Sequence, residues 1–314
     1  MEMAEKIATR EAYGSALVEL ADKYDFVVMD ADLAEATKTI KFKKACPERF
    51  FDCGIAEGNM MSVAAGIATT GKTVFASSFA MFAAGRAFEQ VRNSIGYPHL
   101  NVKIGATHAG ITVGEDGATH QCNEDIALMR TIPGMTIINP SDAVEAKAAV
   151  EAALSTEGPF YLRFGRYAVP VINDTPDYKF ELGRGVEVAE GRDVTIVATG
   201  IMVAMALEAR EMLAAEGISA RVVNIHTIKP IDREIIAKAA RETGAIVTAE
   251  EHNIIGGLGS AVAEVLCEEC PVPMARVGMK DTYGHSGTVP ALLEAYGMTP
   301  ANIVEAVKTA IARK

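Results

Sequence analysis

The residues that could do chemistry in this chain gather in two stretches, and the first is a junction between a strand and a helix. In residues 50–60 a short apolar strand ends and a helix begins with an acid, Glu57. A helix N-terminus favours a carboxylate through its dipole and its free N–H groups, and the rim of a sheet is where ligands bind. The same position suits a structural dipole partner, which is the commoner role of such an acid. Glu57 alone is therefore only a candidate for acid–base catalysis.

The second stretch, residues 107–121, is polar and rich in glycine although its neighbours are apolar. It contains His108, His120, Glu115 and Asp116. An imidazole can donate to an oxyanion and shuttle a proton, and a carboxylate accepts from a hydroxyl. Because so polar a connection is costly inside an apolar chain, it indicates the lining of a site.

The elements that position these residues are predicted from the alternation of apolar strands and helices. A helix is expected over residues 5–24 and a basic loop over 38–46. Strands are predicted at 26–29, 73–78, 102–106, 135–139 and 160–162, and again at 194–198, 220–225, 245–249 and 275–278.

This alternation predicts an α/β fold of two doubly wound domains with mostly parallel sheets. Prolines and acids interrupt it over residues 167–180, which is typical of a linker. We therefore expect a first domain over residues 1–168, a linker over 169–181, and a smaller second domain over 182–314.

Composition narrows the possible functions. The chain has 314 residues, of which 49% are hydrophobic and 23% charged, and its net charge is −11. Such a chain can bury a large core. Nucleic-acid binding needs a clustered basic surface, so the negative net charge argues against nucleic acid as the main partner. No apolar run is long enough for a membrane span and the first residues do not resemble a signal peptide, so we expect a cytoplasmic protein with no membrane partner.

The cysteines do not indicate a disulfide framework, since there are five of them at scattered positions. Cys267 and Cys270 alone have a spacing that suits a metal or a redox pair. No second pair lies near them in the sequence, and Pro271 follows directly, so we interpret them as the end of a helix.

Together the two stretches resemble the pyrimidine-binding domain of transketolase, a thiamine diphosphate enzyme. The family's Gly-Glu-Asp-Gly-x-Thr-His-Gln signature stands at residues 114–121, and residues 250–259 resemble the family's C-terminal domain. The resemblance implies a transferase that moves a two-carbon ketol unit between sugar phosphates. Here the chain is similar to the carboxyl-terminal subunit of a split transketolase.

The resemblance also implies partners. A full-length transketolase has an N-terminal domain that binds magnesium and the cofactor diphosphate, and this chain shows no Gly-Asp-Gly motif followed by an Asn at the family's metal-binding spacing. We expect a separate N-terminal subunit to supply that domain and to ligate Mg²⁺, and we assign no metal ligand to this chain. The active site would lie between chains, with self-association into a dimer and at least two copies of each chain in a heterotetramer.

The resemblance assigns the cofactor thiamine diphosphate to particular residues. Glu57 matches the glutamate that hydrogen-bonds N1′ of the aminopyrimidine ring, and Phe79 and Phe82 match aromatic residues that pack against that ring. Asp32 and Leu33 match a segment that approaches the cofactor near the subunit boundary. The position of a third family aromatic falls near Gly85 or Arg86.

Substrate residues follow in the same way from the resemblance. His108 and His120 match histidines that contact the phosphate, hydroxyls or carbonyl of the sugar, and His120 is expected to take part in proton transfer. Asp116 matches the acid that accepts from the C2 hydroxyl. Arg10 and Arg166 match the arginines that hold the substrate phosphate.

Two alternatives stay open. 1-Deoxyxylulose-5-phosphate synthase carries a stretch similar to residues 114–121, although residues 122–130 look more like transketolase. A non-catalytic partner of a thiamine enzyme is the other alternative. The presence of Glu57, Asp116 and His120 favours catalysis over that role.

Overall fold

A seven-stranded sheet forms the centre of the N-terminal domain in the computed structural model, which describes residues 5–314. The strand order is β12-β6-β7-β5-β4-β2-β3, and every neighbouring pair is parallel except β12 with β6. Its strands are β2 (Phe26–Asp30), β3 (Phe50–Asp52), β4 (Thr73–Phe79), β5 (Val102–Thr107), β6 (Thr136–Ile138), β7 (Phe160–Arg163) and β12 (Thr227–Lys229).

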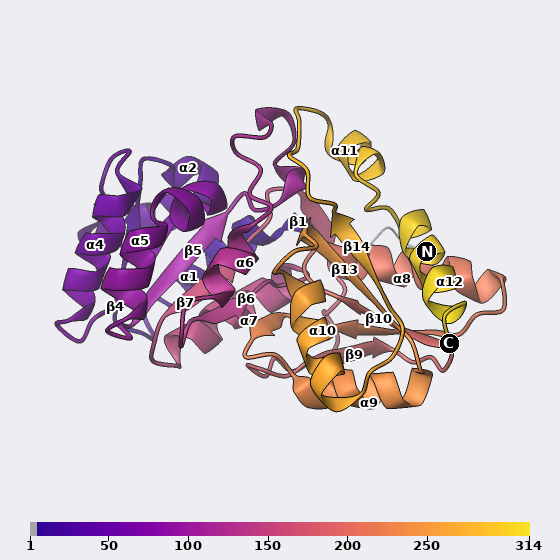
Figure 1. Cartoon of the computed structure of the whole chain (residues 1–314). Coiled ribbons are helices and arrows are strands. Elements are labelled where there is room, and N and C mark those ends of the chain that lie inside the picture. Colours follow the sequence, from indigo (N-terminus) through magenta and orange to yellow (C-terminus); the bar gives the residue numbers. More distant parts are fainter. Residues whose placement is uncertain (1–4) are drawn as a thin grey trace.

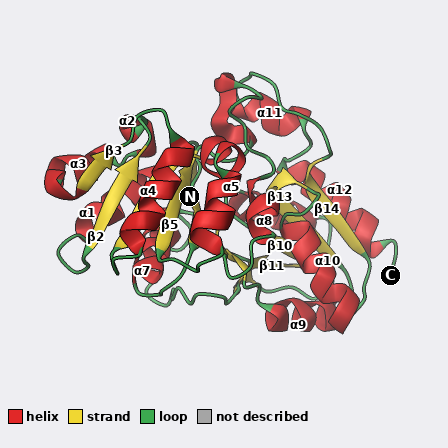
Figure 2. Cartoon of the chain, turned by 60° about the vertical axis from the view of Figure 1, so that its left-hand side comes forward, coloured by secondary structure: helices red, strands yellow, loops and turns green. Residues whose placement is uncertain are grey.

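Helices cover both faces of this sheet (Figure 1, Figure 2). One face carries α4 (Glu57–Ala68), the π-helical segments η2 (Met81–Arg86) and η3 (Val91–Gly96), α5 (Phe88–Gln90) and α6 (Asp125–Arg130). The other face carries α1 (Thr9–Glu19), α3 (Ile40–Ala45) and α7 (Ala143–Leu154). The connections contain α2 (Ala34–Thr37) and the 3₁₀ turns η1 (Pro47–Arg49) and η4 (Ile111–Asp116).

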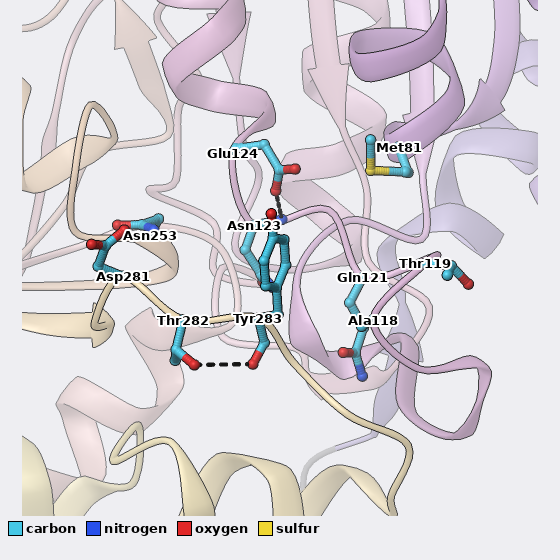
Figure 3. Close-up of a pocket in the computed structure, with 10 residues that line it drawn as sticks. All are labelled: Met81, Ala118, Thr119, Gln121, Asn123, Glu124, Asn253, Asp281, Thr282 and Tyr283. Carbon is cyan, nitrogen blue, oxygen red and sulfur yellow. Dashed lines mark hydrogen bonds between the residues drawn. The ribbon is translucent and has the colours of Figure 1, made fainter.

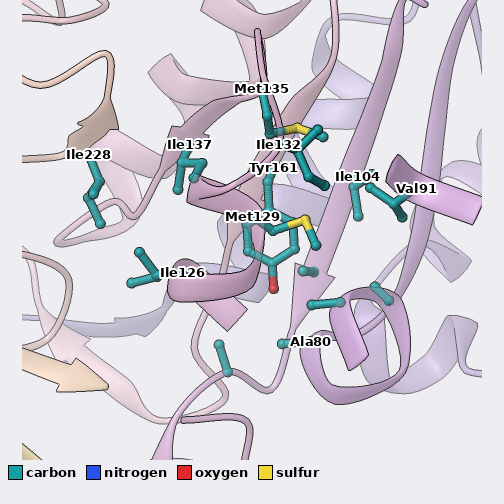
Figure 4. Close-up of a cluster of buried hydrophobic side chains, with 14 of the residues drawn as sticks. Ala80, Val91, Ile104, Ile126, Met129, Ile132, Met135, Ile137, Tyr161 and Ile228 are labelled. Atoms are coloured by element: carbon teal, nitrogen blue, oxygen red, sulfur yellow. The ribbon is translucent and has the colours of Figure 1, made fainter. Parts of the chain in front are cut away.

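Successive strand residues enter opposite cores, as the pleat of a sheet requires. In β4, Phe75 packs with the α1 and α7 side, whereas Ala76 packs with the α4 and η2 side. Figure 4 shows part of the core on the α4 and η2 side, where Met129 and Tyr161 lie together between helix and sheet.

The C-terminal domain has a five-stranded sheet of order β14-β13-β10-β11-β9, in which only β9 runs antiparallel to its neighbour. Its strands are β9 (Val186–Ala189), β10 (Val194–Ala198), β11 (Ala220–Asn224), β13 (Ile246–Asn253) and β14 (Met274–Met279). Helices α8 (Met202–Ala215) and α12 (Pro300–Ile311) cover one face, and α9 (Arg233–Thr243) and α10 (Leu258–Glu269) cover the other. Helix α11 (Val289–Ala295) lies beyond β14 and contacts η4.

The two domains interlock. Strand β12 belongs to the second domain by its place in the chain, yet Thr227 pairs with Ile138 at the edge of the first sheet. The Nζ of Lys229 also donates to the carbonyls of Arg130 and Ile132, at 2.8 and 2.6 Å. One hydrophobic core runs from the first sheet to β11, α9 and α10 without a break.

The α/β fold predicted from the sequence is confirmed, while several local predictions are wrong. Residues 38–46 are not a loop, since α3 lies within them and buries Phe42. The first helix begins only at Thr9, because Lys6–Ala8 forms β1 and pairs with β8 (Ala168–Pro170). Strand β8 crosses the expected start of the linker, so the division of the domains at residues 169–181 stays a prediction. Every helix in the described part of the chain is too short or too polar to cross a bilayer.

Candidate active site

The candidate site lies at one edge of the first sheet, where several parallel strands end. Strand β3 leads to Glu57, β4 ends at Phe79, and β5 is followed by His108. Because parallel strands present their carboxyl ends at the same edge, residues far apart in the sequence meet there.

Glu57 is the first residue of α4 and is almost completely buried, with 2% of its surface exposed. Its carboxylate accepts two hydrogen bonds from one nitrogen of Arg86, at 2.9 Å to Oε2 and 3.1 Å to Oε1. The Arg86 guanidinium carbon lies 4.4 Å from the centre of the Phe82 ring. The acid predicted from the sequence is therefore joined to an aromatic wall through Arg86.

That wall contains two of the predicted aromatic residues and both predicted histidines. Phe79 and Phe82 stack with their ring centres 5.9 Å apart, and the His108 ring stacks on Phe79 at 3.7 Å. The His120 ring meets both phenyl rings edge-on, at 6.3 Å from Phe79 and 5.3 Å from Phe82. Four residues that sequence analysis assigned to cofactor and substrate thus form one cluster.

His108 is held as a neutral ring in one tautomer. Its Nε2 lies 3.0 Å from NH1 of Arg10, which can only donate, so Nε2 accepts and Nδ1 carries the proton toward Thr107 Oγ1 at 2.9 Å. Burial, together with the nearby charges of Arg10 and Arg166, lowers the pKa of His108 to about 3. His108 also has a positive φ of 55°, a conformation that costs energy outside glycine.

We expect the His108 ring to stay neutral at every pH from 5 to 8. Above about pH 6.5 this ring has no effect on the pH dependence of stability. Below that pH, His108 binds a proton in the unfolded chain but not in the folded chain. His108 therefore lowers the free energy of unfolding as the pH falls from about 6.5 toward 3. Ring-carbon NMR of ¹³C-histidine-labelled protein, assigned with His108→Gln, measures its pKa. Arg10→Met should raise this pKa without restoring its usual value, because burial remains, and a wild-type ring that titrates near neutrality would contradict the assignment.

The two predicted phosphate-binding arginines lie near His108. Burial lowers the pKa of Arg10, Glu11 raises it and Arg166 lowers it again, so the two guanidinium groups repel each other. Arg166 lies 3.7 Å from an oxygen of Asp116 and donates to the carbonyl of Val113. Two mutually repelling cations at one edge of the cluster suit a ligand anion placed between them.

Asp32 and Leu33 lie at the same sheet edge, after β2, where the N–H of Asp32 donates to Asp52 Oδ1 at 3.1 Å. Among the described residues, no hydrogen bond or ring contact joins them to the Phe79 cluster.

A cavity of about 700 Å³ opens beside Met81 and Thr119, between the two domains (Figure 3). The cavity is lined by Met81, Ala118, Thr119, Gln121, Asn123, Glu124, Asn253, Asp281, Thr282 and Tyr283.

Sequence reasoning missed the buried polar network that holds the second stretch in place. Arg163 donates from Nε to Asp125 Oδ2 at 2.8 Å and from NH2 to the carbonyl of Glu251 at 2.9 Å. Glu251 Oε1 in turn accepts from the N–H of Thr112 at 2.7 Å. Each of these charged groups is at least 96% buried, so the network ties η4 to β13 across the domain boundary. The only indication of this network in the sequence is an arginine and an acid that stand at the ends of apolar strands.

The glycines before α10 and the two cysteines at its end have structural roles. The Glu250 carboxylate accepts from the N–H groups of Leu258 and Gly259 at the start of α10, and a Cβ on Gly257 would lie 2.0 Å from Glu250 Oε2. Cys267 lies in the last turn of α10 and Cys270 caps it, as the sequence predicted. Within residues 5–314, no three His, Cys, Asp or Glu side chains are arranged to hold a metal ion.

Two models of protein families match the chain. Residues 5–171 match the transketolase pyrimidine binding domain, and residues 183–303 match the transketolase C-terminal domain. A Methanocaldococcus jannaschii protein, named provisionally as a transketolase C-terminal section, is 50% identical over 95% of this chain and 94% of its own length. The 6-deoxy-6-sulfo-D-fructose transketolase subunit of a Clostridium species is 46% identical over 97% of this chain and 95% of its own.

A solved structure gives the same result. A split-gene transketolase, described as an inactive β4 tetramer, superposes with a TM-score of 0.92 at 59% identity and covers 98% of this chain and 99% of its own. Because the family models and these relatives match the chain over nearly its full length, it belongs to the transketolase family, as a C-terminal subunit of the split type.

Proposed function

We propose that the chain is the C-terminal subunit of a two-chain transketolase, which transfers a two-carbon ketol unit between sugar phosphates with thiamine diphosphate. The observation that carries this proposal is the buried Glu57 carboxylate beside the stacked wall of Phe79 and Phe82. Such a site suits a flat ring with polar atoms at its edge, because the ring can stack on the aromatic face and its edge can hydrogen-bond to the carboxylate.

The residues present fit the aminopyrimidine half of the cofactor. Phe79 and Phe82 would pack against the ring, and Glu57 would hold a proton at its N1′. When bound, thiamine diphosphate supplies the carbanion chemistry of ketol transfer. The segment of Asp32 and Leu33, at the same sheet edge, would border the cofactor near the partner subunit.

The substrate would lie on the other side of the aromatic wall. Arg10 and Arg166 would hold its anionic end, and Asp116 would accept from a sugar hydroxyl. His120, edge-on to both phenyl rings, would donate to substrate oxygens and shuttle a proton. His108 would serve as a fixed neutral ring that orients Arg10.

A separate N-terminal subunit would bind the diphosphate and Mg²⁺, as the N-terminal domain of a full-length transketolase does. The solved relative described as an inactive tetramer of β subunits supports this division, and it also supports self-association. The anionic group held by the arginines would be a phosphate or, as the name of the Clostridium relative suggests, a sulfonate.

The test is to measure ketol transfer for this chain alone and mixed with a candidate N-terminal subunit from the same source. Thiamine diphosphate and Mg²⁺ are present throughout, with ketose phosphates and sulfonated ketoses as donors. We expect activity only in the mixture, because each chain would supply half of the cofactor site. Activity of this chain alone would place the diphosphate site within it. Subunits that associate without any activity would contradict catalysis and favour a regulatory partner.

A further inference from the structure

Arg86 stands where the proposed function requires a cofactor ring. Its side chain is 52% exposed, its guanidinium carbon lies over the Phe82 ring at 4.4 Å from the ring centre, and its NH1 donates to Glu57, which is 2% exposed. A guanidinium is planar, stacks on aromatic faces and donates N–H groups in its own plane. Arg86 thus offers the same two surfaces as an aminopyrimidine ring: a flat face for Phe82 and donors for the Glu57 carboxylate.

The ion pair has a physical reason to form in the free chain. A buried carboxylate without a partner is costly, and Arg86 is the only group in the described chain that forms an ion pair with Glu57. The Arg86 side chain has fewer constraints than the buried Glu57 carboxylate. Among residues 5–314, its side chain donates hydrogen bonds to Glu57 alone, and more than half of its surface faces solvent.

We propose that Arg86 is a displaceable stand-in for the aminopyrimidine ring, which closes the Glu57 site in the absence of cofactor and swings into solvent when the cofactor binds. This inference rests on the proposed function. A ring that stacks on Phe82 and meets the same carboxylate cannot occupy the site while the guanidinium is there. Arg86 and the cofactor therefore compete, and apparent cofactor affinity is reduced by the fraction of molecules in which Arg86 is in place.

The experiment is calorimetric titration of thiamine diphosphate, with Mg²⁺, into the assembled two-subunit protein. Arg86→Met keeps the length of the side chain but removes its charge and donors. We expect it to lower the apparent Kd of the cofactor by about two- to tenfold, as loss of a modest internal competitor would. It should also lower the melting temperature of the protein without cofactor and enlarge the stabilising shift that the cofactor produces.

Arg184→Met is the matched control, because Arg184 is 57% exposed and pairs with the buried carboxylate of Asp232 at 3.8 Å, far along the chain from the site. It should leave the Kd unchanged. Arg86→Lys, which keeps the charge but not the plane, should fall between wild type and Arg86→Met. Unchanged or weaker binding in Arg86→Met would overturn the stand-in role. If no version of the assembled protein binds thiamine diphosphate, the proposed function itself fails, and the stand-in role fails with it.

Discussion

Replacing Glu57 with glutamine should lower the turnover rate of the assembled enzyme by about two to four powers of ten, the usual effect of removing a general acid–base group. Glutamine keeps the shape of the side chain and can still accept a hydrogen bond from Arg86. It cannot gain or lose a proton at N1′ of the cofactor. The measurement is steady-state ketol transfer with saturating thiamine diphosphate, beside size-exclusion chromatography of the subunit mixture.

Glu234→Gln provides the comparison. Glu234 is also paired with an arginine, Arg184 at 3.1 Å, but its side chain is 80% exposed and lies on the second domain. Its replacement should leave turnover unchanged. A Glu57→Gln enzyme that assembles normally and keeps more than about a tenth of the wild-type rate would refute the catalytic role of Glu57.

Replacing Arg163 with methionine should destabilise the folded chain by about 3–5 kcal/mol, because it leaves buried carboxylate charge without compensation. Asp125 is fully buried and would keep only the Tyr161 hydroxyl, at 2.8 Å, as a hydrogen-bond donor to Oδ2. Burial lowers the pKa of Arg163 while Asp125 and Glu251 raise it, and the net shift is upward, so the structure favours the charged form. Urea unfolding of the isolated chain measures the loss.

A double-mutant cycle separates lost charge pairing from lost packing. Asp125→Asn combined with Arg163→Met removes both charges, and the double variant should be more stable than Arg163→Met alone. Arg233→Met removes an exposed arginine that bridges Glu268 and Glu269, and it should leave stability unchanged. If the double variant were no more stable than the single one, the ion pair would not be the source of the effect.

The strands that position the site could be predicted from the sequence because each is a buried apolar run followed by polar residues. This pattern placed Glu57, Phe79 and His108 after successive strands of a parallel sheet, and the structure brings all three to one edge. The strand pattern did not predict that His120 lies beside the two phenyl rings, and the family resemblance assigned only His120 to the substrate and the rings to the cofactor. A loop of this kind has no periodicity from which its path could be predicted.

Elements fixed by distant contacts could not be predicted. Helix α3 contains Lys41 and Phe42 in a basic run without an apolar stripe, and its position follows from contacts with α1: Phe42 packs in the α1 core, and Lys41 pairs with Glu11 at 3.0 Å. Arg86 was missed for a similar reason. Its four-residue spacing from Phe82 is helical, but only the fold shows that Glu57 lies within its reach.

Strand β12 has a consequence for how the protein is made. On the ribosome, β6 emerges before the linker and before β9, β10 and β11, so the edge that Thr227 will cover stays open while the first part of the second domain is synthesised. An open edge with Ile137 and Ile138 is a surface on which other nascent chains can add a strand. The first domain therefore completes its sheet only after its own sequence has ended, and the hazard of misassembly persists until β12 docks.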